Sequence, residues 1–378
     1  MASELTLERV RRDVEVVARA GLDTATFVAE AEASLRRAVP HVATCVAIVD
    51  PATRLLTGTF KFGDLYQDDE REHQWALMEY GGDDPTSFVA LADRADAACA
   101  VWEETGGDIS RSPRLREFIR PTYGYGDELR MVARQGTRSW GGMALFRGAD
   151  DAPFTPAEVA FVGSLSECFA AGLRSGLLVR LGAAINDAGP SHGPGVVIIG
   201  ADDTPIQVSM GAEALLAELA SERNMADCTG VIGGLVASAR RYAAGTVDLL
   251  PRARARMPSG RWRVLHASPL SNAAGPTGDV VVTIEEARPP EIVPLVVAAF
   301  ELTARERDVT QLVLQGVDTK EIAASLHMSR YTVQDHLKSV FDKADVRSRR
   351  ELISRIYFDQ YVPRMGGELA PSGWFADE

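Results

Sequence analysis

Residues 302–361 read LTARERDVTQLVLQGVDTKEIAASLHMSRYTVQDHLKSVFDKADVRSRRELISRIYFDQY, and this stretch decides the fold of the C-terminal part. Helix-capping signals divide it into short helices, because Ser, Thr or Asp with Glu three residues later satisfies the free amides of a first turn. The caps are Thr303 with Glu306, Asp318 with Glu321, Ser329, and Ser348 with Glu351. Gly316 suits the left-handed end of the first helix. The sequence therefore predicts a compact module of four helices.

The second and third of these helices form a pair joined by a short connection. His327 and Met328 predict a tight turn between them, which is the connection of a DNA-reading helix-turn-helix. The apolar stripe of the third helix is Val333, Leu337, Val340, Phe341 and Ala344. The polar face opposite it holds Arg330, Gln334, Asp335, Lys338 and Asp342. Such side chains can read base edges in the major groove: Gln pairs with adenine, Asp accepts from cytosine, and Lys donates to guanine.

Charge is distributed unevenly along the chain. The whole chain carries a net charge of −13, which argues against a general nucleic-acid coat protein. Between Ser329 and Arg350, six basic residues minus three acidic residues give +3, and Lys320 adds one more basic group nearby. This region therefore attracts phosphate although the chain as a whole does not.

Several fixed spacings agree with one known family. They are Leu302-Thr303-x-Arg305-Glu306, Gly316-x-x-x-Lys320-Glu321-Ile322-Ala323, Ser329-x-x-Thr332-Val333-x-x-His336-Leu337, and Lys343 followed by Val346-Arg347-Ser348-Arg349. The segment resembles the LuxR/NarL-type helix-turn-helix of bacterial transcription regulators. The resemblance implies DNA-binding roles for Lys320, Ser329, Arg330, Tyr331, Thr332, Gln334, Asp335, His336, Lys338, Arg347 and Arg349.

The same resemblance divides these residues by role. Gln334, Asp335 and Lys338 take the base-reading positions, and the others are phosphate contacts or supports, although His336 can equally be a packing residue. Members of the family bind as dimers to inverted half-sites. The partner surfaces predicted for a homodimer are the helix at 350–361 and the long helices at 4–18 and 155–178.

One departure from the family pattern leaves two interpretations open. The family usually has Lys after Thr-Val, whereas this chain has Gln334 followed by Asp335. An acid in the groove penalises wrong bases, so Asp335 can read a different target, with cytosine opposite it. Alternatively, Asp335 only pairs with a nearby Arg.

The first 288 residues predict two α+β domains. Two helices up to residue 40, strands at 42–49, 55–62, 128–134 and 140–147, and a helix at 155–178 resemble a GAF-like α/β sensor over 1–182. Between the second and third of these strands, only a helix at 112–119 is readable. A linker at 187–194 precedes strands at 195–200, 205–210, 261–268 and 280–285 with helices at 212–219 and 229–244. These elements resemble a PAS-like α+β domain over 192–288.

Prolines at 289, 290 and 294 mark the next boundary, and the helix-turn-helix domain is predicted over 298–365. The fold class is therefore multidomain α+β, ending in an all-α four-helix domain. The order of the parts resembles GAF/PAS-like LuxR-type regulators of the actinobacterial kind.

That order of domains implies that the part before the helix-turn-helix is a sensor that responds to a small molecule. Trp75, Trp102, Tyr123 and Trp140, with Tyr125, can line a ligand pocket, or each can be an ordinary core or surface aromatic. The alternative function for this part is a dimerisation or protein-interaction scaffold without a ligand. Five arginines are interpreted as a solvated face: Arg252, Arg254, Arg256, Arg261 and Arg263. His266 is interpreted as a core histidine.

Other function classes find no signature in the sequence. There is no Walker A motif, no H-E-x-x-H and no G-x-G-x-x-G, so we expect no enzyme. The four cysteines lack metal-ligand spacing and are expected to be reduced thiols, with no metal and no cofactor. No apolar run approaches the ~20 residues of a membrane span, and no signal peptide is evident. We expect a cytoplasmic protein whose partners are double-stranded DNA, a second copy, a small effector and RNA polymerase.

Overall fold

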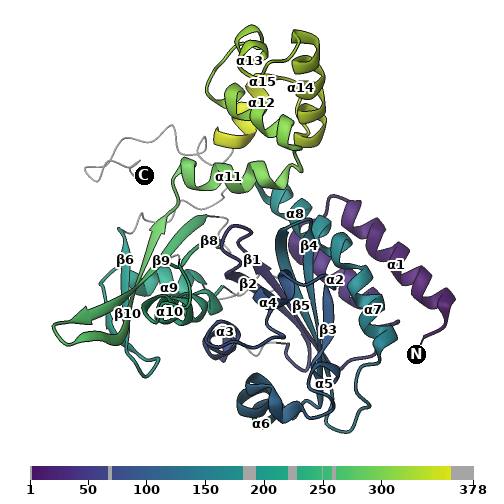
Figure 1. Ribbon diagram of the computed structural model, residues 1–378, viewed down its shortest axis with the longest axis vertical. Helices are drawn as coiled ribbons and strands as arrows, with labels where there is room; N and C mark the ends of the chain where they lie inside the picture. Colours follow the sequence, from purple (N-terminus) through teal and green to yellow (C-terminus); the bar gives the residue numbers. More distant parts are fainter. Residues whose placement is uncertain are drawn as a thin grey trace. The chain divides into compact units, whose positions relative to one another are not determined.

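A computed structural model describes residues 2–66, 70–181, 193–219, 228–248, 250–257 and 261–358. They divide into an N-terminal unit, Met1–Leu177 with His192–Glu286, and a C-terminal unit, Leu178–Ser191 with Ala287–Glu378. Figure 1 shows the elements of both units. Most of the predicted linker at 187–194 and the predicted helix end at Tyr361 lie outside the described residues.

The N-terminal sheet has five antiparallel strands in the order β2-β1-β5-β4-β3. The strands are β1 (Ala43–Val49), β2 (Leu56–Gly63), β3 (Ala98–Ala100), β4 (Asp127–Gln135) and β5 (Arg138–Arg147). All four predicted strands of this region are confirmed. The fifth, β3, was missed because three residues are too few to show an alternating pattern.

Helices cover both faces of this sheet. They are α1 (Glu4–Arg19), α2 (Thr24–Leu35), α3 (Glu72–Tyr80), α4 (Phe88–Ala92), α5 (Val101–Glu104), α6 (Arg120–Tyr123), α7 (Pro156–Ser164) and α8 (Ser166–Leu181). Two neighbouring glycines of β5 show the alternation: Gly141 faces Leu173 of α8, and Gly142 faces Phe88 of α4. Short helical turns at Ile109–Arg111 and Leu115–Ile119 complete the layer that contains α3 to α6.

Two predicted helices differ from the observed ones. The helix expected at 155–178 is confirmed at its capping box, Thr155 with Glu158, but it breaks at Leu165 into α7 and α8. The break has a local cause, because the Ser166 hydroxyl donates to the Val132 carbonyl oxygen at 2.6 Å and accepts from the Arg134 amide at 3.2 Å. The helix expected at 112–119 begins at Pro113, is π-helical over Leu115–Ile119, and continues into α6.

A buried network of charges joins the N-terminal sheet to α3 and the helical turns. Arg114 and Arg130 are 1% and 2% exposed, and both guanidinium groups donate to the Glu128 carboxylate at 2.8 Å. Glu79 accepts from the same two arginines at 3.3 Å and 2.6 Å. Burial alone would raise the pKa of Asp84, but Arg114 and hydrogen bonds from Thr86 outweigh it and lower that pKa. Asp84 is therefore held in its ionised form beside this network.

The central sheet is also antiparallel, in the order β7-β6-β10-β9-β8. Its strands are β6 (Gly195–Ile199), β7 (Pro205–Val208), β8 (Arg252–Arg256), β9 (Trp262–Asn272) and β10 (Gly275–Glu286). Helices α9 (Ala212–Leu219) and α10 (Gly230–Ala243) pack on one face (Figure 1). The predicted strands and helices of this region are confirmed, and β8 is an additional edge strand.

The predicted solvated face of five arginines is wrong. Arg254, Arg261 and Arg263 are buried, and Arg252 and Arg256 are half-buried. The reason is that Arg252–Arg256 form β8, which pairs with β9 and approaches Asp50. The interpretation of His266 as a core histidine is also wrong, since it lies exposed on β9.

The two sheets of the N-terminal unit are tied together by a buried ion pair and a close helix contact. Arg254 of β8 donates two hydrogen bonds, of 2.6 and 2.7 Å, to Asp50, which follows β1. Helix α10 approaches α3 so closely that a Cβ atom at Gly233 would lie 2.4 Å from the His73 carbonyl oxygen. Only glycine fits at that point of contact.

The C-terminal unit contains the predicted four-helix module. The described helices of this unit are α11 (Pro289–Ala299), α12 (Ala304–Leu314), α13 (Thr319–Ser325), α14 (Arg330–Ala344) and α15 (Arg349–Ile353), followed by a turn at Ser354–Phe358. All four expected helices, α12 to α15, are confirmed. Helix α11 was read only as a proline-rich boundary, yet proline at the start of a helix costs no hydrogen bond because the first amides have no helical partner.

Candidate nucleic-acid interface

The turn between α13 and α14 is fixed by backbone geometry and two caps. Asp318 accepts from the amides of Lys320 and Glu321 at 2.7 and 2.9 Å, which begins α13. His327 has a φ of 54°, and the Met328 amide donates to the Ala323 carbonyl oxygen at 2.8 Å. Ser329 then caps α14 by accepting from the Thr332 amide at 3.0 Å. The predicted capping residues and turn are confirmed.

Helix α14 is held by its apolar stripe. Val333, Leu337, Val340 and Ala344 are buried, while Phe341 is half-buried. The stripe packs towards α12 and α13, so the orientation of the remaining faces of α14 is set. Each residue advances about 100° around a helix, so residues near positions 331, 335, 338 and 342 face away from the stripe.

Glu306 braces this arrangement from α12. Its carboxylate accepts from the Ser339 hydroxyl at 2.6 Å and from Lys343 Nζ at 2.7 Å, both on α14. It also accepts from the Thr303 amide at 2.7 Å as part of a capping box. Burial alone would raise its pKa, but these hydrogen bonds outweigh it and lower the pKa of Glu306 to about 2. The carboxylate is therefore charged and joins α12 to α14.

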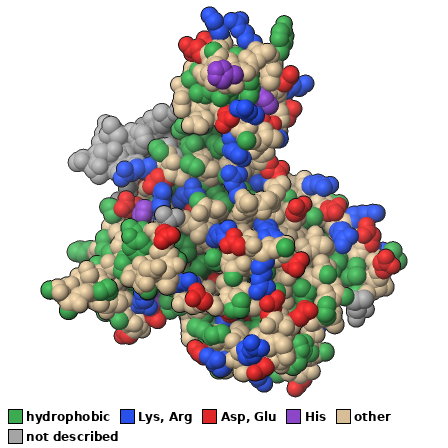
Figure 2. Space-filling model, in the orientation of Figure 1, with side chains coloured by type: hydrophobic (Ala, Val, Ile, Leu, Met, Phe, Trp, Pro, Cys, Tyr) green, Lys and Arg blue, Asp and Glu red, His purple; other side chains and the backbone are tan. Residues whose placement is uncertain are grey.

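The outward side of α14 is exposed and polar. Tyr331 is 85% exposed, and Asp335, Lys338 and Asp342 are also exposed. Nearby exposed cations are Lys320, Arg330, Arg347 and Arg350. Within the part of the chain that the structure describes, none of these charged side chains forms an ion pair. In the view of Figure 2, Lys and Arg side chains lie beside acidic ones on these helices.

The structure gives several predicted site residues a supporting contact. Arg349 donates to the Val317 carbonyl oxygen at 2.9 Å and to the Thr319 hydroxyl at 3.1 Å, which joins α15 to the start of α13. The side-chain amide nitrogen of Gln334 donates to the same Thr319 hydroxyl at 3.4 Å. Ser329 and Thr332 hydrogen-bond to each other at 2.9 Å, and His336 is half-buried. The predicted DNA-binding residues are thus brought together on α13, α14 and the start of α15.

Comparison with known proteins places this module in a family. The model of "Bacterial regulatory proteins, luxR family" matches residues 301–356. The spore germination protein GerE of Bacillus subtilis is 40% identical over 52 residues, which are 14% of this chain and 70% of GerE. The chain belongs to the luxR family. Residues 301–356 therefore carry the DNA-binding helix-turn-helix of that family.

Larger luxR-family relatives match this chain over the same limited part. The monoamine regulon transcriptional regulator of Klebsiella aerogenes is 43% identical over 56 residues, 15% of this chain and 25% of that protein. An HTH-type transcriptional regulator from the exeN 3′ region of Aeromonas salmonicida is 45% identical over 73 residues, 19% of this chain and 37% of that protein. The luxR-family chain thus spans well under half the length of these curated relatives.

Solved structures resemble the luxR-family chain only loosely. The VqmA dimer of Vibrio cholerae, a LuxR-type receptor, is 18% identical, with 43% of this chain and 80% of that chain covered and a TM-score of 0.20. The bacteriophytochrome RpBphP3 of R. palustris is 11% identical, with 76% and 63% covered and a TM-score of 0.31. Likenesses at these TM-scores carry no argument about the N-terminal unit.

The aromatic residues proposed for a ligand pocket do not form one group. Trp75 and Tyr123 lie together, with the Trp75 indole donating to the Tyr123 hydroxyl at 2.9 Å. Their rings pack against Phe118, Tyr125 and Phe146. Trp102 is 40% exposed and Trp140 is 4% exposed, and neither belongs to this cluster. Of the four aromatic residues predicted to line a ligand pocket, the structure therefore brings together only Trp75 and Tyr123.

Two hollows of ligand size lie elsewhere in the N-terminal unit. A cleft of about 360 Å³ lies between α3, α4 and α10, with Leu55, Tyr80, Val89, Ser238 and Val247 in its walls. Sequence reasoning missed it, because its walls come from segments far apart in the chain.

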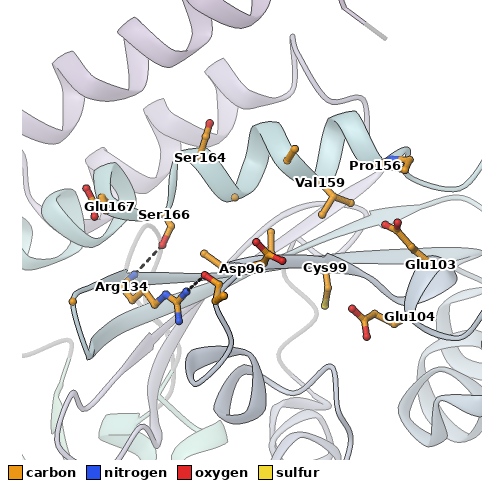
Figure 3. Close-up of a pocket in the computed structure, with 16 residues that line it drawn as sticks. Asp96, Cys99, Glu103, Glu104, Arg134, Pro156, Val159, Ser164, Ser166 and Glu167 are labelled. Atoms are coloured by element: carbon orange, nitrogen blue, oxygen red, sulfur yellow. Dashed lines mark hydrogen bonds between the residues drawn. The ribbon is translucent and has the colours of Figure 1, made fainter.

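The larger hollow is a groove of about 980 Å³ beside β3 and α7. Figure 3 shows Asp96, Glu103 and Glu104 on one side and α7, with Pro156 and Val159, on the other. Arg134 also lines it, but its guanidinium donates to the carbonyl oxygens of residues 92, 94 and 95. Four carboxylates line the groove beside this one arginine, and one of them, Glu104, is ion-paired with Arg94.

The four cysteines form no disulfide bond in the structure. Cys99, in the groove wall, and Cys45, on β1, have pKa values raised to about 12 by burial, which keeps them as thiols. Among the described residues, no group of three or more His, Cys, Asp or Glu side chains could hold a metal ion. No described helix combines the length and apolarity needed to cross a membrane.

Proposed function

We propose that this chain is a sequence-specific transcriptional regulator that binds double-stranded DNA with α14 in the major groove. The observation that carries the proposal is the outward side of α14, which is exposed and braced from behind by Glu306. It is flanked by Lys320, Arg330 and Arg347, which form no ion pair among the residues that the structure describes. Cations without an ion pair in the described part of the fold are available to neutralise phosphates. The base-reading positions are Gln334, Asp335 and Lys338.

Binding as a homodimer follows from the small footprint of one module. A single recognition helix contacts few base pairs, and two modules on inverted half-sites, one helical turn apart, supply the rest. The surfaces proposed for pairing are α15 with the turn at 354–358, and helices α1 and α8. RNA polymerase is a further proposed partner, as for other proteins that regulate transcription.

The N-terminal unit is proposed to sense a small molecule, with a GAF-like domain over 1–182 and a PAS-like domain over 192–288. The cleft of about 360 Å³ supports this, since ligand sites favour mostly apolar hollows at the junction of two structural regions. A ligand there would contact both α3 and α10, which join the two sheets. The cluster around Trp75 favours the alternative, a scaffold without a ligand, because aromatic side chains fill that part of the core.

The first test is binding of the full chain to fragments of its own genomic neighbourhood over a salt series. We expect a footprint of two half-sites, an affinity that falls steeply with salt, and at least tenfold weaker binding by Lys338→Ala. The matched control is Arg120→Ala, which removes one exposed cation from α6, outside the surfaces proposed for pairing, and should leave the footprint unchanged. Absence of a footprint at low salt would contradict the proposal.

A second test separates the sensor from the scaffold. Ser238→Phe adds a ring to the wall of the cleft, so it should leave DNA affinity in vitro unchanged while abolishing the response of a reporter gene to growth conditions. Ser164→Phe, in the wall of the groove beside α7, serves as the control of equal size. A reporter that responds normally in Ser238→Phe would favour the scaffold.

A further inference from the structure

Asp335 lies at the centre of the outward side of α14. At about 100° per residue, it is roughly half a turn away from the buried stripe of Val333, Leu337 and Val340. It is one turn beyond the exposed Tyr331 and lies in the N-terminal half of the helix. In a helix-turn-helix, residues of that half contact base edges. If α14 enters a groove as proposed, Asp335 enters with it.

The structure removes one of the two interpretations that the sequence left open. Asp335 forms no ion pair with any arginine or lysine among the described residues, although Arg330 and Lys338 lie on the same helix. It also caps no helix, because Ser329 and Ser348 perform that role for α14 and α15. The carboxylate therefore has no structural task within the described part of the chain.

An unpaired acid on a DNA-facing surface restricts what it can touch. A carboxylate repels phosphates, and the exposed phosphate-attracting groups lie elsewhere: Lys320 on α13, Arg330 at the start of α14, and Arg347 before α15. Its favourable partners in the major groove are amino groups on base edges. Cytosine presents N4–H₂ and adenine presents N6–H₂, but adenine places the acceptor N7 beside its amino group, which disfavours an anion.

We propose that Asp335 determines specificity by selecting cytosine at one position of each half-site, through a hydrogen bond that its carboxylate accepts from cytosine N4. This inference rests on the proposed function, because it requires α14 to read the major groove. It assigns to Asp335 a discriminating role: the acid lowers affinity for DNA in general and restores it only where an amino group is correctly placed.

The test is selection from a random double-stranded DNA library with the full chain at low salt. The variants are Asp335→Asn and Asp335→Ala, with Asp342→Asn as the matched control. Asp342 is also exposed and also on α14, but it lies two turns further along, in the C-terminal half of the helix and outside the base-reading positions 334, 335 and 338. Its substitution therefore makes the same change of charge on the same helix without touching a proposed reading position. Thermal unfolding of each variant checks that the fold is retained.

The wild-type chain should enrich half-sites with one invariant cytosine, preferred about tenfold or more over the other bases. Asp335→Asn should replace that cytosine by adenine, which an amide can contact through both N6 and N7. Asp335→Ala should lose the preference at that position alone and bind random DNA more tightly. Asp342→Asn should keep the wild-type motif.

The opposing outcomes separate the two proposals. A wild-type motif that neither Asp335 variant alters would overturn the role of Asp335 and leave the DNA-binding regulator intact. The same holds if Asp342→Asn changes the same position, since the effect would then be one of general charge. No enriched motif for the wild-type chain would overturn both.

Discussion

The two units of this molecule use charged side chains in opposite ways. In the N-terminal unit, Arg114, Arg130 and Glu128 are at most 2% exposed and satisfy one another by hydrogen bonds. On the outward side of α14, by contrast, Asp335 and Lys338 are exposed and lack ion pairs within the described residues. Charges of the first kind hold a fold together, because removing one partner leaves a buried ion uncompensated. Charges of the second kind contribute little to stability and remain available to another molecule.

The largest effect should follow from breaking the buried network. Glu128→Gln keeps the shape of the side chain but leaves Arg114 and Arg130 without their shared carboxylate. We expect a loss of about 3–5 kcal/mol in the free energy of unfolding, measured by urea denaturation followed by tryptophan fluorescence. Glu103→Gln, at an exposed position, is the control and should change stability by less than about 0.5 kcal/mol. Equal effects of the two substitutions would mean that a buried, paired charge of this unit contributes no more to stability than an exposed one.

A smaller effect should follow from filling the contact between α3 and α10. A Cβ atom at Gly233 would lie 2.4 Å from the His73 carbonyl oxygen, so Gly233→Ala should force the two helices apart. We expect a loss of about 1–3 kcal/mol, despite the better helix propensity of alanine. Gly211→Ala is the control, since no heavy atom lies within 4 Å of a Cβ there. If both variants unfold at the wild-type midpoint, the close contact between α3 and α10 does not limit the stability of this unit.

Removing the Glu306 carboxylate, which joins α12 to α14, should lower stability by a comparable amount, and this loss should depend on pH. Glu306→Gln removes the charge that Lys343 and Ser339 contact, and we expect a loss of about 1–3 kcal/mol near neutral pH. The pKa of Glu306 is lowered to about 2 from an ordinary value of 4.5, so the stabilisation is complete above about pH 4.5 and disappears as the pH falls towards 2. Calorimetry of the two chains at pH 7 and pH 3 measures this. A difference in melting temperature that grows at pH 3 would contradict the assigned sign.

The sequence predicted the C-terminal unit better than the N-terminal unit, and the reason is physical. Caps such as Thr303 and Ser329 act within one turn of a helix, so they are visible in a short stretch of sequence and were confirmed residue by residue. The burial of Arg254 depends instead on Asp50, 204 residues away, and composition gave no sign of it. Pattern reasoning interpreted the arginine-rich stretch as a solvated face for that reason.

The same limit applies to the candidate sites. The exposed side of α14 could be predicted, because an apolar stripe at helical spacing fixes the opposite face. The cleft between α3 and α10 could not, since its walls join Leu55, Tyr80 and Ser238 from distant segments. The role of Arg349 was only half visible: its spacing matched the family pattern, but its contact with Val317 requires the folded chain.

The smallest change in stability should come from Lys320→Ala. This variant is also the sharpest test of the contrast between buried, paired charges and exposed charges that are available to another molecule. Lys320 is exposed at the start of α13 and makes no ion pair among the described residues, so its loss should leave the unfolding midpoint within about 0.5 kcal/mol of the wild-type value. Its proposed partner is a phosphate, and each phosphate contact contributes about 0.9 to the slope of log affinity against log salt concentration. The slope should therefore fall by about one per module, with the preferred DNA sequence unchanged. A loss of stability with an unchanged slope would mean that this lysine supports the fold, as the buried charges of the N-terminal unit do, and that the division of roles between the units does not extend to α13.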